Sequence, residues 1–93
     1  MIRSFKDKKT EAVAQGKASK GFPPDLVRAA QRKLTMIENA VELRDLKSPP
    51  GNKLHPLEKD RAGQYAIWIN DQFRICFRWA DGGAEDVEIT DYH

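Results

Sequence analysis

Two histidines, His55 and His93, are the only side chains of this 93-residue chain whose unperturbed titration falls near neutral pH. A pair of imidazoles can divide general acid–base catalysis, with one ring removing a proton and the other donating one. Asp91 comes two residues before His93 and could orient either ring and stabilise its protonated form. Tyr92 offers a hydroxyl group and an aromatic plane on which a nucleobase can stack. These residues predict proton-transfer chemistry if the fold brings them together.

Three cationic side chains add phosphate-binding potential to this set. Arg74 lies in the middle of an alternating segment, where a guanidinium group can hold a phosphate or stabilise its transition state. Lys59 and Arg61 follow His55 closely and add positive charge beside it. Each candidate also has an ordinary structural interpretation, because terminal histidines lie on surfaces and strand arginines pair with charges across a sheet. The hypothesis therefore depends on the residues acting as a group.

Other kinds of reactive site have weaker support. Two histidines and one cysteine, Cys76, are too few for a zinc cluster, so no metal or other cofactor is expected. None of Ser4, Ser19 and Ser48 carries the glycine-flanked signature of a hydrolase nucleophile. A single cysteine cannot form an internal disulfide, no apolar run approaches the roughly 18 residues of a membrane span, and no signal segment begins the chain. We expect a cytoplasmic protein without a membrane partner.

The segment from Tyr65 to Trp79 is predicted to form the central β-hairpin. Apolar residues alternate with other residues on both sides of the sequence Asn-Asp-Gln at 70–72. A three-residue loop there pairs Ile69 with Phe73 and collects the apolar side chains on one face, whereas a two-residue loop mixes apolar and charged groups. The hairpin thus predicts a sheet with a core face and a basic face. The basic face would carry Ala66, Trp68, Arg74, Cys76 and Arg78.

The rest of the chain supplies helices and further strands for this hairpin. Asp7 is a suitable N-cap for a short helix that Gly16 ends, and Pro24 opens a longer helix whose apolar stripe reaches Val41. In chain order we predict a strand at 2–5, helices at 8–15 and 24–41, a loop at 48–52, an extended segment at 53–57, a charged turn at 58–63, a turn at 80–84 and a strand at 86–92. This order predicts a single α+β domain over residues 1–93.

The chain is mildly basic, with 16 lysines and arginines against 14 aspartates and glutamates and a formal net charge of +2. Its first 20 residues hold six basic side chains and only two acidic ones. A solvated surface and a nucleic-acid-binding face are both consistent with this local excess.

Four segments carry a family resemblance. They read M-I-R-S-F-K at 1–6, L-R-D-L-K-S-P-P-G-N-K-L-H-P-L at 43–57, N-D-Q-F-R-I-C-F at 70–77 and D-Y-H at 91–93. In this order they resemble the HigB family, within the RelE/ParE superfamily of toxin–antitoxin systems. The resemblance implies a RelE-like fold, in which two N-terminal helices pack on a small twisted antiparallel sheet. It also implies a ribosome-dependent mRNA endoribonuclease, or mRNA interferase, whose partners are the ribosome, mRNA and a HigA-like helix-turn-helix antitoxin. Operator DNA would be contacted only through the antitoxin.

The same resemblance assigns roles to the candidate residues. His55 of K-L-H-P-L and His93 of D-Y-H would act as base and acid, in an order that stays open, and Asp91 would assist them. Arg74 would stabilise the phosphorane formed when the RNA 2′-hydroxyl attacks the adjacent phosphodiester, without a metal. Tyr92 would stack on or orient a nucleotide. The residues expected to bind RNA are Lys53, Lys59, Arg61, Trp68 and Arg78.

Two positions depart from the family pattern. Glu58 stands where relatives often have a lysine, with Lys59 beside it as a substitute, and Trp68 replaces an arginine. The loss of two cations where RNA phosphate is expected predicts a weaker toxin, unless Trp68 stacks on a base.

Two alternative functions fit the same fold, because a fold does not determine an activity. The first is ParE-like inhibition of DNA gyrase without catalysis, for which the histidines would be unnecessary. The second is a toxin that has lost its activity and only holds its antitoxin at the operator. Removing both histidines separates an enzyme from a gyrase inhibitor, because only RNA cleavage would be lost.

Overall fold

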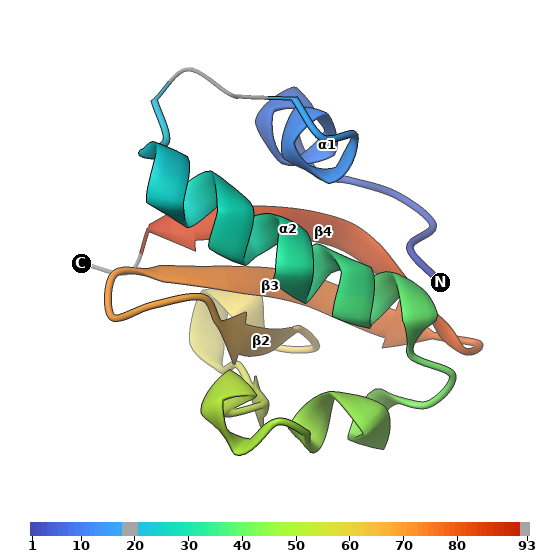
Figure 1. Cartoon of the computed structure of the whole chain (residues 1–93). Coiled ribbons are helices and arrows are strands. Elements are labelled where there is room, and N and C mark those ends of the chain that lie inside the picture. Colours follow the sequence, from blue (N-terminus) through green and yellow to red (C-terminus); the bar gives the residue numbers. More distant parts are fainter. Residues whose placement is uncertain (18–20, 92–93) are drawn as a thin grey trace.

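The computed structural model describes residues 1–17 and 21–91, and it shows two helices packed against one face of a four-stranded sheet (Figure 1). The elements are α1 (Lys8–Ala14), α2 (Pro24–Asn39), β1 (His55–Pro56), β2 (Tyr65–Trp68), β3 (Phe73–Ala80) and β4 (Gly83–Asp91). The strands follow one another in the sheet in the order β1-β2-β3-β4, and each pairs antiparallel with the next. The predicted α+β architecture is confirmed.

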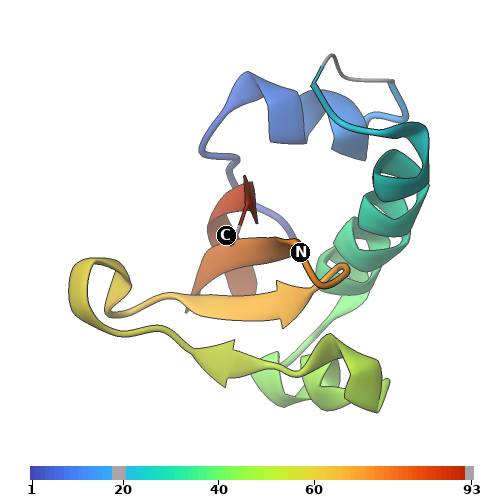
Figure 2. The ribbon, with the colours of Figure 1, turned by 90° about the vertical axis from the view of Figure 1, so that its left-hand side faces the viewer.

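The central hairpin has the predicted three-residue register, in which Ile67 pairs with Ile75. The side chain of Asn70 closes the loop, because its Oδ1 accepts hydrogen bonds from the backbone N–H groups of Gln72 at 2.9 Å and Phe73 at 2.8 Å. The apolar face of the hairpin consequently lies against the helices, and the opposite face of the sheet is turned away from them (Figure 2).

The core forms where the apolar stripe of α2 meets that face of the sheet. Burying side chains of this kind contributes about 1.5–3 kcal/mol each. From α2 the buried residues are Leu26, Val27, Ala30, Leu34 and Ile37, and from the sheet they include Ile67, Ile75, Phe77, Val87 and Ile89. Helix α1 adds Val13, and its N-cap is the predicted one, since Asp7 Oδ1 accepts a hydrogen bond from the backbone N–H of Thr10 at 2.7 Å.

Helix α2 ends at Asn39, and Val41, which was predicted to lie on its buried stripe, is 76% exposed. Ala40 leaves the helix with φ −68° and ψ 131°. The backbone N–H groups of Val41 and Glu42 both donate to Asp45 Oδ2 at 3.0 Å, which starts a separate 3₁₀ turn. The hydrogen bond from Glu42, followed by that from Val41, holds the pKa of the Asp45 carboxyl below its usual range. The side chain of Asp45, four residues after Val41, thus takes the backbone N–H groups that a longer helix would need, and α2 ends earlier than its apolar stripe suggests.

The connection between β3 and β4 is tighter than the predicted turn over 80–84. Asp81 and Gly82 have φ values of 51° and 77°, as the two central residues of a type I′ hairpin turn require. Strand β3 therefore continues to Ala80, and β4 begins at Gly83 instead of at Asp86.

The N-terminal segment runs parallel to β4 along its outer edge, but it does not form the predicted strand at 2–5. Two isolated bridges join Ile2 to Ala84 and Phe5 to Val87. Between these bridges, β4 carries a bulge in which Asp86 has φ 53°, and the bulge interrupts regular pairing. The segment nevertheless covers the edge of β4.

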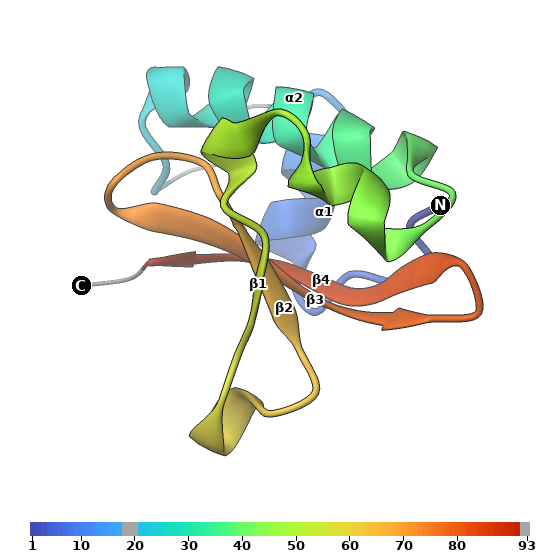
Figure 3. The same cartoon turned by 90° about the horizontal axis from the view of Figure 1, so that it is seen from below.

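Three short 3₁₀ helices complete the fold: η1 (Leu43–Lys47), η2 (Pro50–Asn52) and η3 (Lys59–Arg61). The predicted loop at 48–52 thus contains a helical turn, and the predicted charged turn at 58–63 contains η3. Figure 3 shows η3 at the tip of the β1–β2 connection, which projects away from the helices.

Asn52 is the buried residue that fixes the approach to β1. Its Nδ2 donates to the carbonyl oxygens of Leu46 at 3.1 Å and Ser48 at 3.3 Å. Its Oδ1 accepts a hydrogen bond from Nζ of Lys33 on α2. Asn52 thereby ties η1 and η2 to the main helix just before Lys53 and His55.

Replacing Asn52 by alanine is expected to lower the free energy of unfolding by about 2 kcal/mol, because buried carbonyl oxygens lose their donor and a small cavity remains. Urea denaturation followed by circular dichroism measures this change. Asn39→Ala, the same substitution at an exposed position, is the control and should change stability by less than about 0.5 kcal/mol. Equal effects of the two substitutions would contradict the role of Asn52.

Candidate functional site

The sheet face that is turned away from α1 and α2 carries most of the candidate residues, and we call it the polar face. Cross-strand pairing aligns His55 with Ala66, and Ala66 with Cys76. In the row nearer the hairpin loop, Trp68 pairs with Arg74. Residues paired directly across antiparallel strands share a face, so His55 and Arg74 lie on the same side of the sheet. The polar face comprises Lys53, His55, Ala66, Trp68, Arg74, Cys76, Arg78, Glu88 and Thr90.

Trp68 organises two cations on the polar face. Lys53 Nζ lies 3.7 Å from the centroid of the indole ring, and Arg74 Cζ lies 3.9 Å from it. Cation–π contacts of this kind contribute about 0.5–2 kcal/mol each. The aromatic residue that replaces the family's arginine thus holds two positive charges in place beside an aromatic surface.

The Arg74 guanidinium is fixed by the backbone at the end of the hairpin. Its Nη1 donates to the carbonyl oxygens of Asn70 and Phe73, the latter at 3.1 Å. The residue is only 8% exposed, so its side chain is held along the sheet. A guanidinium with a fixed position can stabilise developing phosphate charge without first reorganising.

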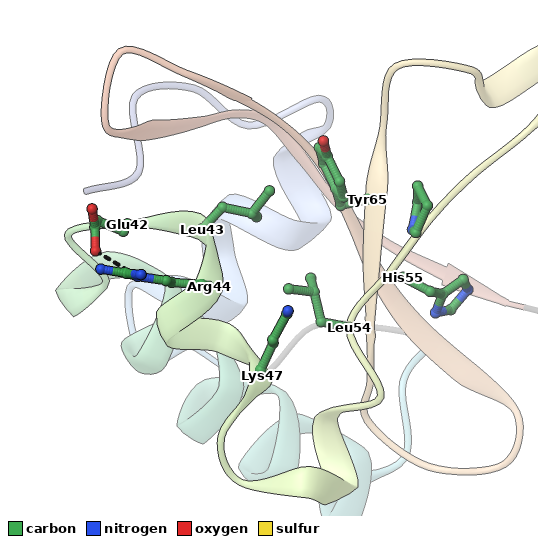
Figure 4. Close-up of a pocket in the computed structure, with 8 residues that line it drawn as sticks. Glu42, Leu43, Arg44, Lys47, Leu54, His55 and Tyr65 are labelled. Atoms are coloured by element: carbon green, nitrogen blue, oxygen red, sulfur yellow. Dashed lines mark hydrogen bonds and ion pairs between the residues drawn. The ribbon is translucent and has the colours of Figure 1, made fainter.

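His55 is oriented by a hydrogen bond of 2.8 Å between its Nδ1 and the carbonyl oxygen of Lys53. A carbonyl oxygen can only accept, so Nδ1 carries a proton and Nε2 of the neutral ring keeps its lone pair. Figure 4 shows the His55 ring and the Leu54 side chain pointing to opposite sides of the strand. The hydrogen bond at Nδ1 leaves Nε2 of His55 placed to accept a proton.

A groove of about 520 Å³ lies beside η1. Leu43, Leu54 and Tyr65 are among the residues that line it, and His55 lines it as well.

The other predicted RNA-binding cations lie around this face. Arg61 of η3 reaches over the sheet, where its Nη1 contacts Glu88 Oε1 at 3.1 Å. Arg78 Nε lies 3.8 Å from Asp86 Oδ2, and both side chains are about half exposed. Lys59 is exposed on η3. The positive charge at this end of the face is thus partly compensated by carboxylates.

The C-terminal candidates are placed differently. Asp91 pairs with Phe73, and its Oδ2 accepts a hydrogen bond from Gln72 Nε2 at 3.1 Å. Phe73 lies on the face of the sheet that packs against the helices, so Asp91 lies at the end of that face. Its neighbour Thr90 pairs with Arg74 and lies on the polar face. Tyr92 and His93 lie outside the described residues.

Cys76 lies beneath the polar face and is fully buried. Burial raises the pKa of its thiol, and the nearby charges of Arg61 and Arg74 offset part of that effect. A thiol with a raised pKa carries little thiolate at neutral pH, which makes it a poor nucleophile. Cys76 therefore serves as a small buried residue in β3.

We expect native protein to react with a thiol-specific disulfide reagent at pH 7.5 only as fast as it unfolds, because Cys76 is inaccessible and protonated. Absorbance of the released chromophore follows the reaction, and protein in concentrated urea provides the control with an exposed thiol. Immediate labelling of the native protein, at the rate seen in urea, would show that the thiol is accessible.

Gln64 and Glu88 are polar-face neighbours that the sequence analysis did not single out. Glu88 lies on the side of β4 opposite Val87 and Ile89. The pairing of Glu88 with Arg61 joins residues 27 positions apart and has no local sequence signal.

Among residues 1–17 and 21–91, no three histidine, cysteine, aspartate or glutamate side chains are grouped to hold a metal ion. No helix in the same described part of the chain is long and apolar enough to cross a membrane.

Solved structures of known proteins have the same fold as this chain. YoeB in the YoeB–YefM complex from Staphylococcus aureus superposes with a TM-score of 0.62 and 15% identity, covering 100% of this chain and 98% of that chain. YafQ from E. coli gives a TM-score of 0.61 with 14% identity, covering 98% and 93%. The two helices and the antiparallel sheet thus form the RelE-like toxin fold.

Sequence comparison identifies the family within this class. A family model for the RelE-like toxin of the type II toxin–antitoxin system HigB matches residues 3–93. Toxin HigB-1 of Vibrio cholerae is 36% identical over 85 residues, 90% of each chain, and Endoribonuclease HigB of Proteus vulgaris is 33% identical over 93 residues, 100% of each chain. This chain belongs to the HigB-like toxins of type II toxin–antitoxin systems, in which an antitoxin is the partner of the toxin.

Proposed function

We propose that this protein is an endoribonuclease that cuts mRNA on the ribosome and thereby inhibits translation. The observation that carries the proposal is the placement of His55 and Arg74 on one face of the sheet, with Trp68 beside Arg74. A proton acceptor, a fixed guanidinium and an aromatic surface are the groups that phosphodiester cleavage in single-stranded RNA needs. The name of the Proteus vulgaris relative, Endoribonuclease HigB, supports the same activity.

The proposed reaction is attack by the RNA 2′-hydroxyl on the adjacent phosphorus. One histidine, with Nε2 of His55 as the described candidate, takes the 2′-hydroxyl proton as the O2′–P bond forms. The P–O5′ bond then breaks, and the second acid–base group, assigned to His93, donates a proton to the leaving O5′. The products are a 2′,3′-cyclic phosphate and a 5′-hydroxyl end, and no metal takes part.

The remaining residues have supporting roles in this proposal. Arg74 stabilises the negative charge that develops on the phosphorane oxygens. Asp91, which lies on the opposite face from His55, orients the ring of His93, and Tyr92 stacks on or orients a nucleotide. RNA is bound by Lys53, Lys59, Arg61, Trp68 and Arg78. The contacts of Trp68 with Lys53 and Arg74 support an RNA-binding role, because a base can stack at the indole while the cations meet phosphate.

The proposed partners follow from the family. A HigA-like helix-turn-helix antitoxin neutralises the toxin and carries the pair to operator DNA, which the toxin does not contact itself. The ribosome delivers the mRNA substrate, so the protein acts in the cytoplasm.

The proposal is tested by adding purified protein to a reconstituted translation reaction and mapping mRNA ends by primer extension. We expect discrete cuts with ribosomes present and no cuts in the same mRNA without ribosomes. A gyrase supercoiling assay run in parallel should be unaffected. Inhibition of supercoiling without any mRNA cleavage would replace this proposal with the ParE-like function.

A further inference from the structure

Arg61 is held by two acceptors from different parts of the chain. Its Nη1 donates to Gln64 Oε1 at 3.0 Å and to Glu88 Oε1 at 3.1 Å. The side chains of Arg61 and Glu88 are 30% and 19% exposed, so the pair is partly shielded from water but open to a ligand at the surface. Gln64 is buried at the start of β2. A guanidinium, an amide and a carboxylate thus form one small cluster on the polar face.

Glu88, at the far side of this cluster, lies in the same cross-strand row as His55. The row continues from His55 through Ala66 and Cys76 to Glu88. Neighbouring strands are about 4.8 Å apart, so the backbones of His55 and Glu88 are separated by about 14 Å across the sheet. The contact between Arg61 and Glu88 is therefore separate from His55 on the same face, where a phosphate flanking the cleaved one could reach it.

Glu88 is an acidic residue among the cations of the polar face. Glu88 pairs across the strands with Cys76, two residues after Arg74 on β3, and it contacts Arg61 of η3. A carboxylate here repels RNA phosphate, but it also offers Arg61 the same kind of oxygen acceptors that a phosphate offers. Carboxylate and phosphate are therefore competing ligands for one guanidinium.

We propose that Arg61 and Gln64 form a phosphate subsite for the RNA backbone beside the cleavage position, and that the Glu88 carboxylate occupies this subsite until RNA replaces it. The subsite takes a backbone phosphodiester of single-stranded RNA. Glu88 lowers the affinity of the polar face for RNA, because its carboxylate competes with that phosphate for Arg61. The inference rests on the proposed endoribonuclease function, and it adds a flanking-phosphate contact and a competing side chain to it.

The test uses Glu88→Gln, which keeps the shape and the acceptor for Arg61 but removes the charge. In the reconstituted translation reaction, this variant should lower KM for the ribosome–mRNA substrate by about 3–10-fold, with kcat within about twofold of wild type, since a competing anion is gone. Glu11→Gln, the same charge change on α1, is the matched control and should leave KM unchanged. Thermal denaturation of each variant checks that the fold is retained.

A double-mutant cycle with Arg61→Gln separates competition from a general charge effect. Arg61→Gln should raise KM, and adding Glu88→Gln to it should produce no further gain, because the guanidinium that Glu88 occupies is absent. The salt dependence of cleavage at low substrate should steepen in Glu88→Gln by about 0.7 in the log–log slope, because the phosphate then displaces a counterion from Arg61 where it displaces the Glu88 carboxylate in the wild type.

Three results would overturn the inference while wild-type cleavage persists. They are an unchanged KM in Glu88→Gln, a loss of activity that follows a loss of thermal stability, and an equal gain in the Arg61→Gln background. The second of these would mean that Glu88 only pins η3 to the sheet. Absence of cleavage by wild type would instead overturn the proposed function, and the subsite with it.

Discussion

Replacing Arg74 by alanine is expected to lower kcat for mRNA cleavage by about 10²–10³-fold, the usual cost of removing a fixed group that stabilises transition-state charge. The backbone carbonyls of Asn70 and Phe73 hold the guanidinium in place before substrate arrives. Arg74→Lys keeps a charge but loses the planar fork that these carbonyls hold, so it should recover only part of the rate. Single-turnover cleavage on programmed ribosomes measures the loss.

Arg28→Ala is the matched control for Arg74. Arg28 lies on α2, where it is exposed and paired with Asp25, on the opposite side of the sheet from the polar face. Its removal should change the cleavage rate by less than about twofold, since it contacts no proposed substrate group. If both alanine variants lost activity equally, or if Arg74→Ala remained fully active with native stability, Arg74 would have no special role in charge stabilisation.

Replacing His55 by alanine is expected to lower kcat by about 10²–10⁴-fold, with little change in KM, because general acid–base catalysis acts on the chemical step. His55→Gln provides the sharper comparison. A glutamine amide can still donate to the carbonyl oxygen of Lys53, but it offers no basic nitrogen in place of Nε2. Both variants should be equally impaired in single-turnover cleavage on ribosomes. Substantial activity in His55→Gln would show that the hydrogen bond to Lys53 matters and the proton transfer does not.

The central hairpin could be predicted from the sequence because its apolar residues alternate on both sides of a short polar loop. That pattern decides the register, and the register alone puts Trp68 beside Arg74. The part of the site that depends on strand pairing could therefore be predicted from the alternation of apolar residues and the length of the loop.

Features that depend on side-chain hydrogen bonds to the backbone, or on contacts between residues far apart in the sequence, could not be predicted from this local pattern. The end of α2 is decided by the Asp45 carboxylate, which takes the backbone N–H groups of Val41 and Glu42. The bulge at Asp86 interrupts pairing of the N-terminal segment with β4. The partnership of Arg61 with Glu88 forms only once η3 folds over the sheet. In each case the stabilising partner lies outside the residues that define the local pattern.

The substitution of Trp68 for the family's arginine has a structural explanation. An arginine at this position would bring a third cation close to Lys53 and Arg74, whereas the indole attracts both of them. With tryptophan at position 68, this part of the polar face has one positive charge fewer, but it has an aromatic surface that orders Lys53 and Arg74. In the proposed function, this exchange moves RNA binding at this point from phosphate contact towards base stacking.

The most direct test of this account is primer extension on mRNA from a reconstituted translation reaction, comparing wild type with the His55→Ala, His93→Ala double variant. We predict discrete, ribosome-dependent cuts with the wild type and none with the double variant, provided that both proteins have the same thermal stability. Cuts that persist in the double variant would contradict the proposed histidine chemistry. Arrest of cell growth by both proteins without any mRNA cuts would contradict the endoribonuclease assignment itself.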